Sequence, residues 1–213
     1  EYDAKRMLAR WFADHPGGSS YGGKVALIGP DTNMDELLKD APWLSKEKLV
    51  VKPDQLFGKR GKHGLLLLDA DWNDAKKWIS ERMNKETTVG KTTGVLNQFL
   101  VEPFTPHDEN EEWYVAMKDE RENDIIYFSM KGGIFVEENW DKVIEFKVPI
   151  MGDLDEKALA SRLGDLGPKR DKVVNFVKNL YAFFAENGFS YLEINPFTFS
   201  KDGNIVPLDM VAK

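Results

Sequence analysis

Basic residues and glycines alternate after a short apolar segment, and this pattern suits a phosphate ligand. Lys52 ends the apolar segment, and Lys59, Arg60 and Lys62 follow shortly afterwards. The glycines among them are Gly58, Gly61 and Gly64. Glycine lets backbone N–H groups approach a ligand closely, and clustered positive charges neutralise phosphate oxygens. A solvated basic turn would have the same composition, so the residues alone leave both interpretations open.

A second group of polar residues lies near the end of the sequence, in YLEINPF and PLDM. Glu193 and Asn195 alternate along one predicted strand, so their side chains should share a face. A hairpin around residues 201–204 would bring Asp209 on the next strand near Asn195. Amide and carboxylate oxygens beside phosphates are ligands that Mg²⁺ accepts. The alternative is a polar hairpin with a buried, hydrogen-bonded asparagine.

The stretch LVEPFTPH, residues 100–107, contains two prolines that stiffen the exit from a strand. Backbone groups near Pro103 and Thr105 could therefore face a planar base. Glu111 and Glu112 open the next strand, where an acidic side chain could hold ribose hydroxyls. An ordinary strand exit explains the same residues.

The stretch TTVGKTTG, residues 87–94, resembles the end of a P-loop. That motif reads G-x-x-x-x-G-K-[ST], with a strand before it and a helix after it. Counting back from Gly90, Lys85 stands where the first glycine belongs, and a strand follows where the motif needs a helix. We therefore expect Gly90, Lys91 and Thr92 to form a turn that contacts no phosphate.

Hydrophobic periodicity and turn residues predict the elements that must position these groups. Helices are expected at 3–13, 33–41, 72–83, 156–164 and 169–188. Strands are expected at 24–29, 48–54, 64–70 (a buried one), 96–104, 111–118, 124–130, 143–149, 190–199 and 204–212. Pro207 predicts a bulge in the last strand, because proline cannot donate to a ladder. The mixed order predicts an α+β fold with at least two sheet units and a cleft between them.

Composition excludes several classes of function. The 213 residues carry a formal net charge of −7, which argues against broad nucleic-acid binding. The alternative that residues 59–62 bind nucleic acid is disfavoured for this reason. Salt-sensitive binding of RNA or DNA would be needed to support it. There is no cysteine, so disulfides, thiolate catalysis and cysteine-based zinc sites are excluded. The absence of cysteine fits a reducing cytoplasm, which is the location we expect. No apolar run approaches the roughly 20 residues of a membrane helix, so we expect no membrane partner.

Three long segments closely resemble the ATP-grasp region of the ATP-citrate lyase family. They are APWLSKEKLVVKPDQLFGKRGKHG, TTVGKTTGVLNQFLVEPFTPHDENEEWYV and YLEINPF followed by KDGNIVPLDMVAK. In two-subunit forms of the family this region begins the β subunit. The β subunit of citryl-CoA synthetase looks similar, and that of succinyl-CoA synthetase is a more distant relative. The resemblance implies two α+β lobes that hold the nucleotide in the cleft between them, roughly 24–95 for the smaller lobe and 1–23 plus 96–213 for the larger.

The resemblance also implies a role for each matching residue. Lys52 would contact the ATP phosphates, with Arg60 and Gly61 over the nucleotide. Pro103 and Thr105 would present backbone to adenine, and Glu112 would bind the ribose. The implied Mg²⁺ ligands are Asn195 and Asp209, and Glu193 would lie near a phosphohistidine brought in by a partner.

In this family ATP phosphorylates a histidine, and the phosphoryl group passes to citrate before CoA attacks and acetyl-CoA and oxaloacetate form. His15, His63 and His107 lack the glycine-rich setting of that histidine. The resemblance therefore implies a CoA-ligase-type α subunit or domain that carries the phosphohistidine, in a hetero-oligomer. CoA and citrate would bind elsewhere in the complete enzyme. We expect a fragment of a longer polypeptide, with the citrate pocket in the part that follows Lys213.

Other functions remain open at this point. The sequence does not separate ATP-citrate lyase from citryl-CoA synthetase, nor ATP from GTP. A succinyl-CoA synthetase β subunit is disfavoured by VVKPDQ and PWL. A non-catalytic nucleotide-binding or assembly module is the alternative from another class.

Overall fold

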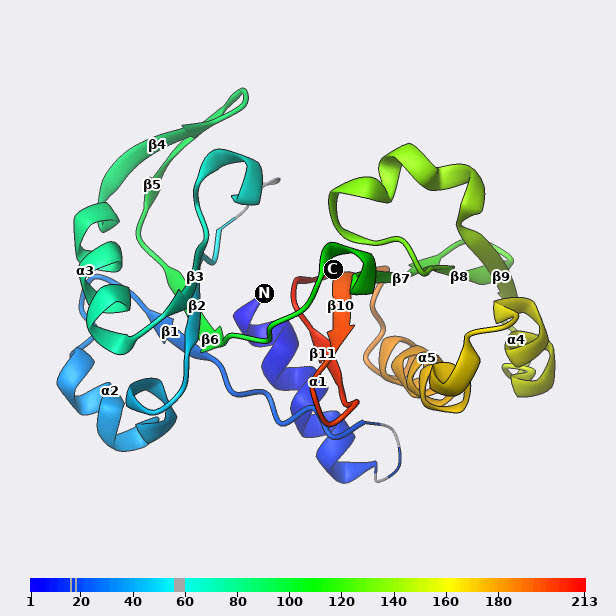
Figure 1. Ribbon diagram of the computed structural model, residues 1–213. Helices are drawn as coiled ribbons and strands as arrows, with labels where there is room; N and C mark the ends of the chain where they lie inside the picture. Colours follow the sequence, from blue (N-terminus) through cyan, green and yellow to red (C-terminus); the bar gives the residue numbers. More distant parts are fainter. Residues whose placement is uncertain (16, 18, 56–59) are drawn as a thin grey trace. The chain divides into compact units, whose positions relative to one another are not determined.

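The computed structural model describes residues 1–15, 17, 19–55 and 60–213 (Figure 1). The chain divides into two compact units. The larger unit contains Glu1, Asp3–Gly23 and Thr105–Lys213, and the smaller unit contains Tyr2 and Lys24–Phe104. The division falls after Phe104, whereas the family resemblance implies a smaller lobe of roughly 24–95. The reason is that the strand at 99–103 pairs inside the sheet of the smaller unit.

The smaller unit is built on a four-stranded antiparallel sheet of order β1-β6-β2-β3. Its elements are β1 (Ala26–Ile28), α2 (Met34–Asp40), η1 (Pro42–Ser45), β2 (Leu49–Pro53), η2 (Arg60–His63), β3 (Leu67–Ala70), α3 (Trp72–Arg82), β4 (Lys85–Val89), β5 (Thr92–Leu96) and β6 (Phe99–Pro103). The core contains Val51, Ile79 and Phe99, each with no exposed surface.

Helix α3 begins where its sequence predicts. The Asp71 side chain accepts hydrogen bonds from the backbone N–H groups of Asn73 and Asp74. This cap satisfies two donors that a helix start leaves unpaired. The apolar positions Trp72, Ala75 and Ile79 recur at helical spacing, and all three are buried. The predicted helix is therefore confirmed, and it covers the core of the smaller unit.

The larger unit is built on a six-stranded antiparallel sheet of order β11-β10-β7-β8-β9, with β12 also paired to β10. Its elements are α1 (Tyr2–Asp14), η3 (Glu109–Glu111), β7 (Trp113–Asp119), β8 (Asn123–Ser129), η4 (Gly133–Phe135), η5 (Glu137–Lys142), β9 (Ile144–Pro149), α4 (Glu156–Leu163), η6 (Gly167–Lys169), α5 (Arg170–Glu186), β10 (Tyr191–Phe199), β11 (Ile205–Pro207) and β12 (Met210–Ala212). Strand β9 lies at one edge of this sheet and pairs with β8.

The two faces of this sheet bury different groups. Along β7, Trp113, Val115 and Met117 face the main core, which includes side chains of α1, α4 and α5. Tyr114 and Ala116 alternate with them on the opposite face, in a small cluster with Val136. The second face therefore buries a separate, smaller group of side chains.

Three details differ from the sequence analysis. Strand β3 is not buried, because Leu68 is 55% exposed. Residues 85–89 form strand β4, which a polar sequence without alternating apolar residues does not reveal. The last predicted strand is divided into β11 and β12 at Leu208 and Asp209, whose N–H groups both point to the Pro196 carbonyl. This interruption lies where Pro207 predicts a bulge.

The α+β prediction is confirmed by these two sheets and their helices. Within the described ranges, every helix is too short or too polar to cross a membrane.

Candidate functional site

Lys52 lies on β2 and is almost fully buried. Its Nζ lies 2.8 Å from Oε1 of Glu102 on β6. In the β2–β6 register Val50 is opposite Glu102, so Lys52 reaches its partner diagonally across the strand pair. A buried ammonium group requires such a partner, because an unpaired charge there is costly. Lys52 is thus held in place as a charged group at the end of β2.

Arg60 lies in the same part of the smaller unit. Its Nη1 donates a hydrogen bond of 2.7 Å to the carbonyl of Pro53, the residue after Lys52. Gly61 lies within η2. The structure therefore brings the two predicted phosphate-binding side chains to one end of β2. Gly58 and Lys59, also assigned to the basic loop, lie outside the described residues.

The predicted adenine contacts fall at the end of β6. Pro103 is the last residue of that strand and is opposite Leu49. The Thr105 carbonyl, which belongs to the larger unit, lies 2.6 Å from Nδ1 of His107. A carbonyl oxygen has two lone pairs, so this contact leaves Thr105 one further acceptor position.

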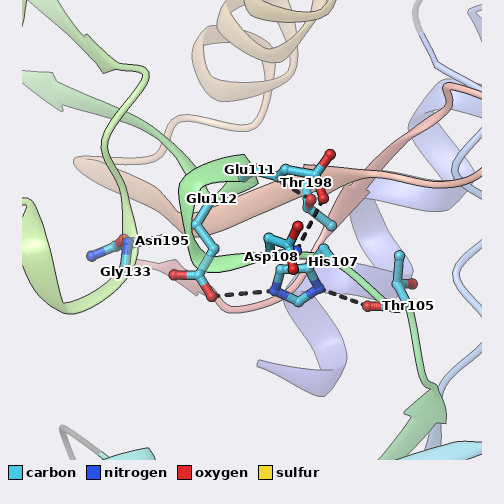
Figure 2. Close-up of polar contacts among 8 residues, drawn as sticks. All are labelled: Thr105, His107, Asp108, Glu111, Glu112, Gly133, Asn195 and Thr198. Carbon is cyan, nitrogen blue, oxygen red and sulfur yellow. Dashed lines mark hydrogen bonds and ion pairs between the residues drawn. The ribbon is translucent and has the colours of Figure 1, made fainter.

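The predicted ribose residue, Glu112, contacts the same imidazole. Oε1 of Glu112 lies 3.2 Å from Nε2 of His107 (Figure 2). The hydrogen bond to Glu112 raises the pKa of His107 above 6.5. Burial opposes this shift, whereas the Thr105 carbonyl and the charges of Glu112 and Glu111 add to it.

Two glycines allow Glu112 to lie where it does. A Cβ on Gly133 would overlap Oε2 of Glu112, and the φ of Gly133 is +62°. A Cβ on Gly132 would come within 2.7 Å of the Trp113 backbone. The N–H of Gly132 donates to the Glu112 carbonyl at 2.8 Å. The carboxylate therefore lies between His107 and Gly133, as Figure 2 shows.

The predicted metal ligands are adjacent in the larger unit. The backbone N–H of Asn195 donates to the carbonyl of Asp209 at 3.0 Å. Oδ1 of Asn195 accepts a 2.7 Å hydrogen bond from the N–H of Gly133 and retains a second lone pair. One amide and one carboxylate oxygen fit Mg²⁺, which is commonly held by one or two protein groups plus phosphates and water. Within the described residues there is no cluster of three or more acidic, histidine or cysteine side chains that could hold a metal.

Glu193 lies on β10, directly opposite Ala116 of β7. Its Oε2 accepts a short hydrogen bond from the Tyr191 hydroxyl. Burial and this hydrogen bond raise the pKa of Tyr191 above 10. Burial and the charge of Glu193 raise the pKa of Tyr114. The Tyr191 phenol therefore stays protonated and donates to the Glu193 carboxylate, which positions that carboxylate.

The GKT stretch is a hairpin turn. Gly90 has a φ of +63° and, with Lys91, connects β4 to β5. The two strands form a ribbon of their own, which projects from α3 in Figure 1. Because a strand follows the turn, residues 87–94 do not have the strand–loop–helix geometry of a P-loop.

Sequence reasoning missed three residues that contact the predicted site residues, namely Glu102, His107 and Gly133. Glu102 was hidden because its partner lies on another strand. His107 carried a signal, because a histidine five residues before Glu112 can face it across a short turn. Gly133 could not be associated with Glu112 or Asn195 without the fold.

Two units that each combine an antiparallel sheet with helices fit the ATP-grasp class of domains. The family model for the ATP-citrate synthase ATP-grasp domain matches residues 1–213, and the chain belongs to this family.

Curated and structural relatives agree with this assignment. ATP-citrate synthase alpha chain protein 2 of Arabidopsis thaliana is 40% identical over 211 residues, which are 99% of this chain and 49% of the relative. ATP-citrate synthase of Homo sapiens is 40% identical over 192 residues, 89% of this chain and 17% of the relative. An ATP citrate lyase structure from Methanothrix soehngenii, in complex with citrate and coenzyme A, has a TM-score of 0.87 and 50% identity. It covers all of this chain and 49% of that one.

The chain therefore spans about half the length of the plant relative and of the Methanothrix soehngenii chain. The resemblance implies a β subunit, whereas the plant relative that this chain matches is named an alpha chain. The name of the subunit therefore differs between the two. The expected membership of this family is confirmed.

Proposed function

We propose that this chain is the MgATP-binding, phosphoryl-donor part of an ATP-citrate lyase. The complete enzyme would convert ATP, citrate and CoA to ADP, phosphate, acetyl-CoA and oxaloacetate. The observation that carries the proposal is the family match over the whole of residues 1–213. The placement of the expected polar groups supports it, because Lys52 and Arg60 lie together and Glu112 and Asn195 both adjoin Gly133.

In this proposal the chain positions ATP and neutralises charge. Pro103 and Thr105 present backbone to adenine, and Glu112 accepts hydrogen bonds from ribose hydroxyls. Lys52, Arg60 and the backbone at Gly61 stabilise the charge that develops on the transferring phosphoryl group. Asn195 and Asp209 would hold Mg²⁺, which neutralises phosphate oxygens when it is bound. Glu193, held by Tyr191, would face the histidine that receives the phosphoryl group.

We propose that this histidine belongs to a CoA-ligase-type partner subunit or domain in a hetero-oligomer. Two of the chain's own histidines have other contacts. The ring of His15 stacks on Trp11 with centroids 3.9 Å apart, and His107 lies between Thr105 and Glu112. CoA and citrate would bind to other parts of the enzyme, and the reaction would take place in the cytoplasm.

Calorimetric titration with MgATP and MgGTP tests the binding part of this proposal. We expect residues 1–213 to bind MgATP without releasing phosphate, because the phosphoryl acceptor lies elsewhere. Lack of binding to either nucleotide by both this region and the full-length protein would overturn the assignment. The relative affinities would also establish the choice between ATP and GTP.

The catalytic part is tested in the full-length protein with its partner. Lys52→Ala and Asn195→Ala should each reduce phosphohistidine formation about a hundredfold, because each removes charge stabilisation from the transferring group. Unchanged phosphorylation would favour a non-catalytic nucleotide-binding or assembly module. Detection of citryl-CoA as the released product would instead identify a citryl-CoA synthetase.

A further inference from the structure

His107 lies between two groups that can only accept hydrogen bonds. Nδ1 is 2.6 Å from the Thr105 carbonyl oxygen, and Nε2 is 3.2 Å from Oε1 of Glu112. A neutral imidazole has a single N–H and can satisfy only one of these acceptors. The imidazolium form has two N–H groups and satisfies both. The geometry therefore fits a protonated His107.

The turn that carries His107 is fixed at several points. Asp108 and Glu111 form a capping box around η3, with the Asp108 N–H donating to Oε2 of Glu111 at 3.0 Å. The hydroxyl of Thr198, on β10, donates to the Glu111 carbonyl at 3.1 Å (Figure 2). The backbone between Thr105 and Glu112 is thus attached to the sheet. Because His107 lies on this fixed backbone, its ring can hold the Thr105 carbonyl and the Glu112 carboxylate in place.

Glu112 is also confined on its other side. Its Oε2 adjoins Gly133, at which any Cβ would overlap it. The carboxylate therefore has a narrow range of positions, with His107 on one side and the Gly133 backbone on the other. A group confined in this way is pre-organised and loses little freedom when it binds a hydroxyl.

We propose that protonated His107 is a positioning residue for nucleoside recognition, holding the Glu112 carboxylate and the Thr105 carbonyl at fixed positions for ribose and base. This inference rests on the proposed function, which assigns these two groups to the nucleoside. It predicts that ribose recognition depends on pH through His107.

The sign of this dependence follows from the charges around the ring. Glu112 and Glu111 are the acidic groups whose charges act on His107, and both favour the imidazolium. Because the pKa of His107 is raised above 6.5, the contribution is fully present below pH 6.5. It is lost as the pH rises through the raised pKa.

The test compares MgATP with the magnesium complex of 2′,3′-dideoxyATP, using calorimetry of the full-length protein between pH 5.5 and 8.5. Both nucleotides carry the same triphosphate, so protonation of the triphosphate changes both dissociation constants equally. The ratio of the two constants therefore reports only the contribution of the ribose hydroxyls. We expect ATP to be favoured about tenfold or more at pH 5.5, the value of one or two charge-assisted hydrogen bonds. The preference should fall to a few-fold above the pKa of His107. A ratio that does not change with pH would overturn the inference, and this measurement needs no variant.

His107→Gln provides the second arm, because glutamine is neutral and its single amide group cannot bridge both acceptors in the same way. We expect a low ratio at every pH, with the Kd of 2′,3′-dideoxyATP changed less than that of ATP. His15→Gln is the matched control, because His15 also contacts a backbone carbonyl through Nδ1 but lies outside the site. It should keep the wild-type ratio and pH profile. A folded His107→Gln protein with the wild-type ratio would overturn the inference while leaving ATP binding established. Failure of both nucleotides to bind the wild-type protein would instead contradict the proposed function.

Discussion

At the scale of single residues, the candidate site depends on a close approach between Glu112 and the backbone of Gly133, which only glycine permits. Gly133 combines a left-handed backbone with contact to Glu112 and a hydrogen bond to Asn195. The residue proposed to bind ribose, Glu112, and the proposed metal ligand Asn195 thus share one glycine as a neighbour. Displacing that glycine would disturb both groups, although Gly133 itself has no side chain to offer.

Gly133→Ala tests this dependence. Strain at a positive φ costs about 1 kcal/mol, and the overlap with Glu112 should add about 1–2 kcal/mol. We expect a lower free energy of unfolding in denaturant titrations and MgATP binding about tenfold weaker. Gly164→Ala is the matched control, because Gly164 also has a positive φ, +77°, but nothing lies near its Cβ position. Equal effects of the two substitutions on MgATP affinity would contradict the role of Gly133.

At the scale of elements, the pairing of β2 with β6 decides where charge lies in the smaller unit. The register places Val50 opposite Glu102 and thereby lets Lys52 reach the carboxylate at 2.8 Å. Lys52 and Glu102 are far apart in the sequence. A shift of one residue along either strand would move one of the two charges to the opposite face.

Substitutions of this pair can separate stability from binding. Lys52→Met should lower the free energy of unfolding by about 3–5 kcal/mol, because it leaves Glu102 buried without its ammonium partner. The double variant Lys52→Met/Glu102→Leu should recover most of that loss, since an apolar pair of similar size is tolerated in place of buried charges. MgATP affinity should stay low in both variants. Recovery of affinity in the double variant would show that Lys52 supports the fold alone.

The hairpin of β4 and β5 gives the opposite expectation. Lys91 is exposed at the turn between β4 and β5. Lys91→Ala should therefore change the Kd for MgATP by less than about threefold, because a lone exposed charge contributes under about 1 kcal/mol. Titration beside Lys52→Ala measures this directly. A loss comparable to that of Lys52→Ala would restore a phosphate-binding role to the GKT stretch.

At the scale of the whole molecule, the elements were more predictable than the contacts between them. Local patterns predict α3 through its Asp71 cap and the antiparallel run β7 to β9 through their apolar residues. Strand β4 was missed, because Val89 is its single apolar residue and no alternation can be read from it. The domain boundary differed because β6 joins a sheet formed by residues far away in sequence. Pairs such as Lys52 with Glu102 depend on register, which composition does not specify.

The function of the complete enzyme likewise depends on more than residues 1–213. We propose that the chain holds a nucleotide, and it covers about half of its plant relative. Its net charge of −7 agrees with a small-molecule ligand held by a few local cations, since a polyanionic partner would meet repulsion over most of the surface. The remaining steps of the proposed reaction require residues from outside this region.

The outermost strand of the larger sheet has a further consequence, for behaviour at high protein concentration. Edge strands can act as templates for strand addition between molecules, but two carbonyls of β9 already accept hydrogen bonds from outside the sheet. Nε of Arg162 donates to the Glu145 carbonyl at 3.2 Å, and the N–H of Gly152 donates to the Pro149 carbonyl at 2.9 Å. Glu145 and Lys147 are exposed on β9, and Pro149 ends it without an N–H to donate. Charges and a terminal proline hinder the docking of a second strand. The exposed charges and the terminal proline of β9 thus help to keep separate molecules from joining their sheets edge to edge.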